Sequence, residues 1–223
     1  MEIGCLPFNK TGVFSSLMED YVSQVAGLKP FYGNSPDLAG LNAQRALKKA
    51  SFSLTQRKVL QDVLREQYQG LSEMQAVEKQ IELLGDAKTT TVVTGHQLNL
   101  FSGPLYFLYK IISVINLAET LSDQKTLGAV VPVYWMATED HDFDEANHVT
   151  VIKNDSSAET ISIKRPSDLN QQVGRELINV DIEEQITHFF EASGSSQFSD
   201  ELKAWLKEDF NPKNTQKRAF LTF

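Results

Sequence analysis

One short acidic stretch, residues 138–145, has the residue types that acid–base or metal chemistry requires. It reads Thr-Glu-Asp-His-Asp-Phe-Asp-Glu and holds five carboxylates and one imidazole. Clustered carboxylate oxygens suit a divalent cation, and an imidazole beside carboxylates suits general acid–base catalysis. The structural alternative is a solvated acidic loop that caps the next element. Because the stretch directly follows an apolar run, we favour a functional role, with four candidate catalytic residues: Glu139, Asp140, His141 and Asp142.

A second polar stretch, residues 95–110, has features of an anion-binding loop. It begins with Gly-His-Gln after a β-branched run and leads through Gly-Pro into an apolar helical pattern. The free N–H groups at a helix N-terminus suit a phosphate or carboxylate, and Lys110 on the second turn would add positive charge. The stretch matches neither GxxxxGK[ST] nor GxGxxG. The candidate substrate- and nucleotide-binding residues are Gly95, His96, Gln97, Asn99, Gly103, Tyr106 and Lys110.

The order strand, helix, strand would bring these two stretches together. The β-branched run 89–94 predicts a strand, and residues 103–121 predict a helix that is buried on most sides. The unalternating apolar run 129–137 is typical of a strand covered on both faces of a parallel sheet. Ligands of open α/β folds bind at the carboxyl ends of such strands. We therefore predict that residues 95–110 and 138–148 face each other across a crevice.

The rest of the chain predicts helices before this unit and a smaller module after it. Apolar residues at spacings of three and four between residues 14 and 25 predict a buried helix face, and further helices are expected from about residue 53 and from residue 74 to a stop at Gly85. Alternation on either side of residues 154–157 predicts a β-hairpin. Two short helices follow, one opening at Asp181 with a capping-box glutamate at 184 and the other near Ser199.

Composition limits the classes of function. The chain has 223 residues, of which 41% are hydrophobic and 22% charged, as in ordinary globular proteins. Its 29 acidic and 21 basic residues leave a net charge of −8 with no basic cluster, which argues against nucleic acid or an anionic membrane as partner. The most apolar stretch, 105–118, is too short to span a bilayer. With Cys5 as the only cysteine and no secretory signal pattern, we expect a cytoplasmic protein.

Three longer motifs together resemble the bacillithiol-biosynthesis cysteine-adding enzyme family. They are Thr94-Gly95-His96-Gln97-Leu98, then Ser102-Gly103-Pro104-Leu105-Tyr106-Phe107-Leu108-Tyr109-Lys110, and Pro132-Val133-Tyr134-Trp135-Met136-Ala137-Thr138-Glu139-Asp140-His141-Asp142-Phe143. Two further landmarks of that family are similar to Pro30-Phe31-Tyr32 and Val173-Gly174-Arg175. The resemblance runs from near residue 14 to about residue 210, and the motifs together are far more specific than any short pattern.

The resemblance implies a ligase that joins cysteine to glucosaminyl-malate in the last step of bacillithiol biosynthesis. The family is similar to class I aminoacyl-tRNA synthetases, with a Rossmann-type core, an inserted connecting-peptide domain and a C-terminal coiled coil. On this template the chain has an α/β fold. Residues 1–150 hold N-terminal helices and the first part of a Rossmann-like parallel sheet, and residues 151–223 begin the inserted α+β domain. ATP or ADP and Mg²⁺ are the implied cofactors. Lys110 would then contact phosphate, and the acidic loop would hold the amine or Mg²⁺.

Three features depart from this template. The synthetases have two histidines at the helix start, whereas here only His96 is present and it lies before the helix. No Cys or His cluster resembles a zinc site for a thiol substrate. The family continues well past the length of this chain, and residues 214–223 fit the family poorly. We therefore expect the full-length protein to make bacillithiol and the isolated 223 residues to be inactive alone. Any homo-oligomer would form through elements outside them.

Two other functions stay open on the residues alone. The first is a metal-dependent hydrolase that uses the cluster 139–142, which tight metal binding without nucleotide would favour. The second is a non-catalytic remnant that binds a small ligand or a partner, because an incomplete parallel sheet leaves an open edge and apolar faces.

Overall fold

A computed structural model describes residues 4–71, 74–123, 127–165 and 171–222, and for residues 220–222 it describes the backbone alone. The chain divides into two compact units, one of residues 1–90 with 119–131 and one of residues 91–118 with 132–223. The predicted domain boundary at residue 150 follows the family template rather than this division, and it stays a prediction. In the described parts, no helix is long and apolar enough to cross a membrane.

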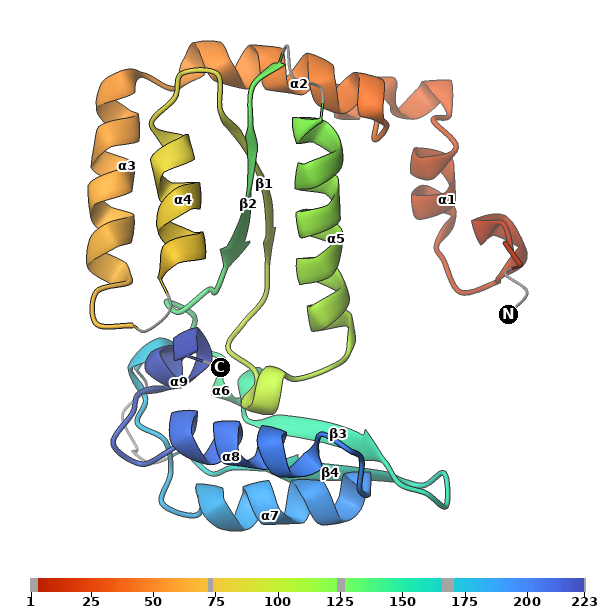
Figure 1. Ribbon diagram of the computed structural model, residues 1–223. Helices are drawn as coiled ribbons and strands as arrows, with labels where there is room; N and C mark the ends of the chain where they lie inside the picture. Colours follow the sequence, from red (N-terminus) through yellow and green to blue (C-terminus); the bar gives the residue numbers. More distant parts are fainter. Residues whose placement is uncertain (1–3, 72–73, 124–126, 166–170, 223) are drawn as a thin grey trace. The chain divides into compact units, whose positions relative to one another are not determined.

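The predicted strand–helix–strand unit is present. Strand β1 (Thr90–Gly95), helix α5 (Tyr106–Ser122) and strand β2 (Val130–Trp135) follow one another, and the two strands pair in a parallel sheet (Figure 1). The Thr90 amide donates to the Ala129 carbonyl at 3.1 Å, and the His96 amide donates to the Trp135 carbonyl at 3.2 Å. This confirms the predicted α/β, Rossmann-like fold class.

The predicted burial of this unit was wrong in part. Helix α5 exposes a row of large apolar side chains, and Trp135 at the end of β2 is 60% exposed. Only the first residues of β2, Val130 and Val131, are fully buried. An apolar run shows that a surface favours being covered, but it does not say which other element covers it. The exposed large apolar residues of α5 are Tyr106, Leu108, Tyr109, Ile112 and Ile115.

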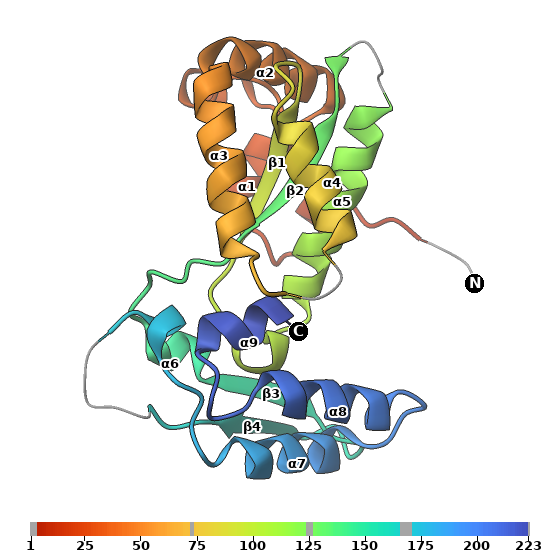
Figure 2. The same cartoon turned by 60° about the vertical axis from the view of Figure 1, so that its left-hand side comes forward.

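The first unit is largely helical. Ser53 caps α3 in a reciprocal capping box with Gln56, and α4 ends at Gly85 as expected. Helix α2 was missed, because its apolar face is short and interrupted by polar residues. Helices α3 and α4 lie side by side (Figures 1 and 2). The helices of the first unit are η1 (Phe8–Lys10), α1 (Ser16–Val22), η2 (Ala26–Phe31), α2 (Leu38–Ser51), α3 (Leu54–Gln67) and α4 (Gln75–Leu84).

Helix α1 forms where the spacing predicts it, but its apolar face is not buried. Leu17 is 64% exposed, and the other apolar residues of the pattern from Met18 to Val25 are exposed as well. The periodicity identified the helix because local hydrogen bonding and the Ser15 cap suffice to start it. Burial of the face would require a partner element, which the periodicity does not supply.

Two buried arginines hold the first unit together by donating to main-chain carbonyls. Arg45 donates to the carbonyl groups of Leu121 at 2.9 Å and Gly128 at 2.7 Å. Arg57 donates to the carbonyls of Leu84 and Thr89, both at 2.9 Å. The last carbonyls of a helix have no partner within the helix, so these guanidinium groups satisfy the ends of α5 and α4.

The second unit contains the predicted hairpin. Strands β3 (His148–Ile152) and β4 (Ala158–Ser162) pair antiparallel with Val149 opposite Ile161. Helix α7 (Ile182–Ser193) packs on the hairpin, and α8 (Ser199–Asp209) lies beside α7 (Figures 1 and 2). The expected capping box of α7 does not form, because the Glu184 amide donates to the main-chain carbonyl of Asp181 and the Asp181 side chain makes no capping bond.

The closing segment is an integral part of this unit. Ile178 and Gln216 donate their amides to the carbonyls of Asn214 and Glu176, at 3.0 and 2.8 Å. Helix α9 (Gln216–Thr222) then packs against η5 (Val173–Arg175), and Ala219 is completely buried. The segment from Asn214 to Ala219 therefore packs as part of this unit.

A single apolar core underlies both polar stretches in the second unit. The segment after β1 contributes residues around η3 (Leu100–Ser102), and the acidic stretch contributes residues of the short helix α6 (Phe143–Ala146). These meet residues of the hairpin, η5 and α7 to α9. The buried members are Leu98, Leu100, Phe101, Phe143, Ala146, Val149, Val151, Ile161, Ile163, Val173, Ile178, Ile182, Ile186, Ala192, Leu206, Phe210 and Ala219.

Candidate functional site

The segment between β1 and α5 alternates polar residues with apolar anchors. Its backbone takes the left-handed conformation at Phe101 (φ 49°) and Ser102 (φ 69°), which is costly for residues with a Cβ. Phe101 is held there by edge-to-face contacts with Phe189 and Phe210, at centroid distances of 5.4 and 5.5 Å. Gly103 follows with φ 59° and ψ −147°, a conformation that glycine alone adopts readily. The loop is therefore rigidly shaped by the core beneath it.

The acidic stretch is likewise a built loop. Ala137 turns the chain with a φ of 48°, and the Asp140 amide donates to the Ala137 carbonyl at 3.2 Å. One oxygen of Asp140, Oδ1, accepts from the amides of His141 at 2.6 Å and Asp142 at 3.1 Å. Asp142 then caps α6, and Phe143 is buried in the core. These bonds fix the main chain around Asp140.

The two loops meet at Gln97 and Asp140. The Gln97 amide nitrogen donates to Oδ2 of Asp140, so both oxygens of this carboxylate accept hydrogen bonds. Donation from Gln97, followed by donation from the amides of Asp142 and His141, lowers the pKa of Asp140 below its ordinary value. Where the sequence predicted a crevice between facing residues, these two side chains are in direct contact.

A second group of predicted residues gathers around His96. Its Nε2 lies 2.5 Å from the hydroxyl of Tyr106. Lys110 turns toward the strand end as expected: its Nζ donates to the Gly95 carbonyl at 3.3 Å and lies 5.3 Å from the Tyr106 ring centroid. The Tyr134 hydroxyl donates to the His96 carbonyl at 3.1 Å, and burial raises the pKa of Tyr134.

Four buried polar atoms of this loop have no hydrogen-bond partner in the described parts of the chain. Asn99 is 5% exposed and Ser102 is 7% exposed, so the cost of leaving their oxygens unpaired is high. A polar ligand that reached this loop would satisfy such groups. The atoms are His96 Nδ1, Gln97 Oε1, Asn99 Oδ1 and Ser102 Oγ.

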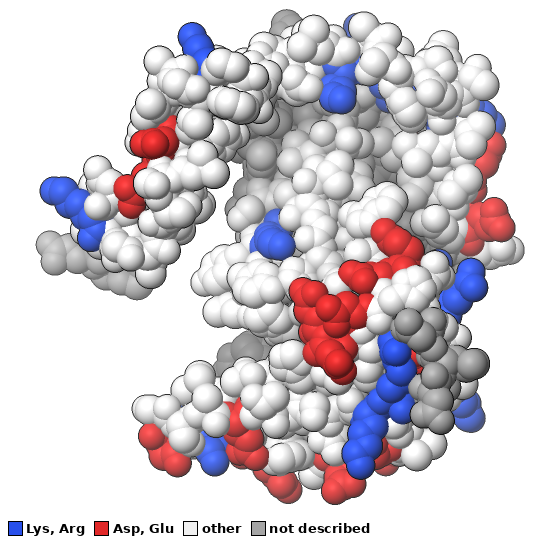
Figure 3. Space-filling view, turned by 180° about the vertical axis from the view of Figure 1, so that it is seen from behind, with Lys and Arg blue, Asp and Glu red and all other residues white. Residues whose placement is uncertain are grey.

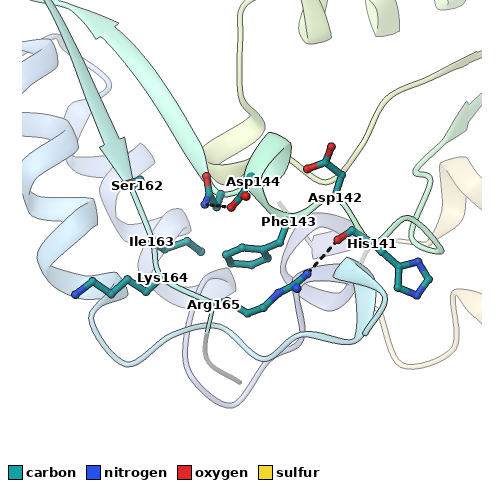
Figure 4. Close-up of a pocket in the computed structure, with 9 residues that line it drawn as sticks. His141, Asp142, Phe143, Asp144, Ser162, Ile163, Lys164 and Arg165 are labelled. Atoms are coloured by element: carbon teal, nitrogen blue, oxygen red, sulfur yellow. Dashed lines mark hydrogen bonds between the residues drawn. The ribbon is translucent and has the colours of Figure 1, made fainter. Parts of the chain in front are cut away.

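The four candidate catalytic residues do not form one surface. Glu139 accepts from the indole N–H of Trp135 at 3.2 Å, while Asp140 faces Gln97. His141 and Asp142 instead line a pocket of about 430 Å³ beside the hairpin, shown in Figure 4. The other lining residues of this pocket are Phe143, Asp144, Asn147, Ser162, Ile163, Lys164 and Arg165.

Charge is unevenly distributed over the molecule. Figure 3 shows a dense group of acidic side chains with a line of Lys and Arg beside it. Asp140 is half-buried, whereas Glu139, His141 and Asp142 are exposed. Within the described ranges, no three His, Cys, Asp or Glu side chains lie close enough together to hold a metal ion.

Sequence reasoning missed the residues that hold the acidic loop from outside. The amides of Val173 and Gly174 donate to the carbonyls of Asp140 at 2.7 Å and Thr138 at 3.1 Å. Gly174 is required there, because a Cβ would lie 2.7 Å from the Thr138 Cβ. The motif Val173-Gly174-Arg175 was noticed as a family landmark, but nothing local in it indicates which loop it contacts.

A parallel strand–helix–strand unit with shaped polar loops after both strands is typical of Rossmann-like α/β proteins, a class that binds its ligands at the strand ends. The chain belongs to the family described as bacillithiol biosynthesis BshC, N-terminal Rossmann-like domain, whose model matches residues 1–223. The match includes residues 214–223, which we expected from the sequence motifs alone to fit the family poorly.

Curated relatives share this family name. Over 148 residues the chain is 47% identical to "Putative cysteine ligase BshC" of Flavobacterium johnsoniae, covering 66% of this chain and 28% of the relative. The protein of that name from Heliobacterium modesticaldum is 31% identical over 188 residues, covering 79% of the chain and 34% of the relative. The one from Bacillus anthracis is 35% identical over 142 residues, covering 63% of the chain and 26% of the relative. The chain thus spans about a third or less of these relatives.

Proposed function

We propose that this chain supplies the Rossmann-like part of a ligase that joins cysteine to glucosaminyl-malate. The family membership and the name of the relatives support the reaction class. The observation that carries the proposal to these residues is the contact of Gln97 with Asp140, which joins the loops after both parallel strands into one site. As a biosynthetic enzyme of small thiols it would act in the cytoplasm on small molecules, with neither nucleic acid nor membrane as partner.

Each loop suits a different part of the substrates. Lys110 at the end of β1 brings positive charge to the polar atoms of the loop after it, as a carboxylate or phosphate requires. Asp140 has a lowered pKa and is ionised at neutral pH, so it is better fitted to hold a substrate ammonium group than to accept a proton. His141, exposed at the pocket, has the residue type of a general base.

ATP is the co-substrate that this site would use. Amide formation from a carboxylate needs an activated acyl group, which a phosphate or adenylate donor supplies. The unpartnered hydroxyl of Ser102 can donate to an anionic group at the loop after β1, and the amine of Lys110 can pair with it. The unpartnered Asn99 oxygen would accept from a donor group of the same ligand. Mg²⁺ would then accompany the phosphates.

Two experiments test the proposal. Isothermal titration of the 223-residue chain with Mg²⁺-ATP, cysteine and glucosaminyl-malate should show binding of at least one of them, weakened by Lys110→Met. The complete reading frame that encodes these residues should restore bacillithiol to a strain that lacks its cysteine-adding enzyme. Failure of complementation by a well-expressed protein would contradict the ligase proposal. Tight binding of Mn²⁺ or Zn²⁺ without nucleotide would favour a metal-dependent hydrolase instead.

A further inference from the structure

Arg165 reaches from the end of the hairpin to the acidic loop. Its Nη2 donates to the main-chain carbonyl of His141 at 3.1 Å, and its guanidinium carbon lies 4.9 Å from the centroid of the Phe143 ring. Figure 4 shows the side chain extended along the pocket toward both residues. Arg165 therefore contacts the loop at its main chain and at its apolar anchor, just after Asp140.

Glu176 holds Arg165 in this direction. Its Oε1 lies 3.2 Å from Nε of Arg165, and its Oε2 accepts from the Gln171 amide at 3.0 Å. Glu176 is completely buried, so its charge requires partners inside the protein. The buried carboxylate thus forms an ion pair with the Nε end of the Arg165 guanidinium and helps to orient it.

The same side of the molecule holds the loop at two more points. Val173 and Gly174 of η5 donate their amides to Asp140 and Thr138, on either side of Glu139. With the bond from Arg165 to His141, three main-chain carbonyls between residues 138 and 141 accept from this side. A loop held in this way is restrained, because displacement would break the bonds to the Thr138 and Asp140 carbonyls and leave the His141 carbonyl with only its bond from the Phe143 amide at 2.9 Å.

We propose that Arg165 is a positioning residue for the acidic loop and that Glu176 holds it in place. The contact fixes the main chain beyond Asp140 and with it the two amides that donate to the Asp140 carboxylate. The consequence for turnover rests on the proposed function, in which Asp140 holds a substrate ammonium group. A displacement of about 1 Å in such a group can cost a hundredfold in rate.

The first test is Arg165→Lys. Lysine keeps a cation near Glu176, but it lacks the planar group that contacts Glu176 and His141 together. In the 223-residue chain, we expect an unchanged thermal midpoint and hydrogen exchange at least tenfold faster at the amides of His141, Asp142 and Val173. In the complete reading frame, kcat should fall at least tenfold while KM for cysteine changes less than twofold. Arg175→Lys, at an exposed arginine of η5, is the matched control and should leave all four quantities unchanged.

The second test separates positioning from stability. Arg165→Met leaves the buried Glu176 carboxylate without this cation and should lower the thermal midpoint. Adding Glu176→Gln removes the buried charge and should restore the midpoint. If Arg165 positions the loop, the double variant still exchanges its loop amides faster and keeps a low kcat. Wild-type exchange and kcat in the double variant, or in Arg165→Lys, would overturn the proposal.

The exchange measurement also distinguishes this proposal from the ligase proposal. If the complete reading frame has no ligase activity, the proposed function fails, and the amide exchange rates of the 223-residue chain still decide whether Arg165 holds the loop. If activity is present and exchange does not respond to Arg165→Lys, the positioning role fails alone.

Discussion

The Gln97 side-chain amide donates to the carboxylate of Asp140 and so joins the two loops that follow the parallel strands. The other oxygen of that carboxylate accepts from two main-chain amides of its own loop. Asp140 is therefore held by both loops at once, and the hydrogen bonds from Gln97 and from two main-chain amides stabilise its charge. This arrangement favours the ionised form of Asp140, which the proposed contact with a substrate ammonium group would require.

Loss of the Asp140 charge should reduce turnover. We expect Asp140→Asn in the complete reading frame to lower kcat/KM at least tenfold, about 1.4 kcal/mol of transition-state stabilisation. His141→Ala should have an effect of similar size if its imidazole takes part in the reaction. Steady-state kinetics with glucosaminyl-malate as the varied substrate measure both. Glu191→Gln, on the exposed side of α7, serves as the control, and equal kinetics in all variants would return the acidic loop to a structural role.

The contact with Gln97 should also make stability depend on acid pH. The pKa of Asp140 lies below that of an unfolded chain, about 3.9, so its stabilising contribution is complete above that pH and lost as pH falls through the folded-state pKa. We expect Gln97→Ala to shift the titration of Asp140 to higher pH, because the largest cause of the lowered pKa is removed. Carboxyl ¹³C NMR of the 223-residue chain from pH 7 to 2 measures this. Identical titration midpoints of Asp140 in the unaltered chain and in Gln97→Ala would mean that the Gln97 contact is absent in solution.

Gly174 should not tolerate a side chain. A Cβ there would lie 2.7 Å from the Thr138 Cβ and 2.8 Å from its carbonyl oxygen, and neither atom is the far end of a flexible side chain. We expect Gly174→Ala to lower the free energy of unfolding by about 1–3 kcal/mol. Urea denaturation measures it, with Gly27→Ala as the control because nothing lies within 4 Å of that position. A loss no larger than that of the control would show that η5 is not held against the loop.

Arg45 should be more important for stability than an exposed cation on the same helix. It is 5% exposed and donates to main-chain carbonyls at the end of α5 and in the connection to β2. Arg45→Met would leave these carbonyls without their donor, at an expected cost of about 1–3 kcal/mol. Lys48→Met is the matched control, since Lys48 is exposed on α2. Urea midpoints that fall equally in both variants would contradict a special role for Arg45.

Much of the local structure was predictable from residue order. The β-branched run before Gly95, the turn residues between β3 and β4, and the serine at the start of α3 each act through neighbours in the chain. Local hydrogen bonds and side-chain periodicity are enough to specify such elements. The same information identified both polar loops, because each directly follows a strand.

The contacts between distant residues were not predictable. Nothing around Arg165 indicates that it reaches His141, and nothing in η5 indicates that its amides bind the main chain at Thr138 and Asp140. The exposed faces of α1 and α5 show the same limit, since an apolar pattern does not name its partner. These pairings depend on how the hairpin and helices α7 to α9 pack on one core.

The sequence alone determined the α/β class, the parallel strand order and the two polar stretches where chemistry is expected. Only the tertiary structure decided that Gln97 contacts Asp140 and that the other acidic residues point elsewhere. The physical reason is that strand and helix formation depend on neighbours along the chain, whereas the direction of a loop side chain depends on the core beneath it. Here that core contains both Leu100 and Phe143, and their burial sets the positions of the polar residues next to them in the chain.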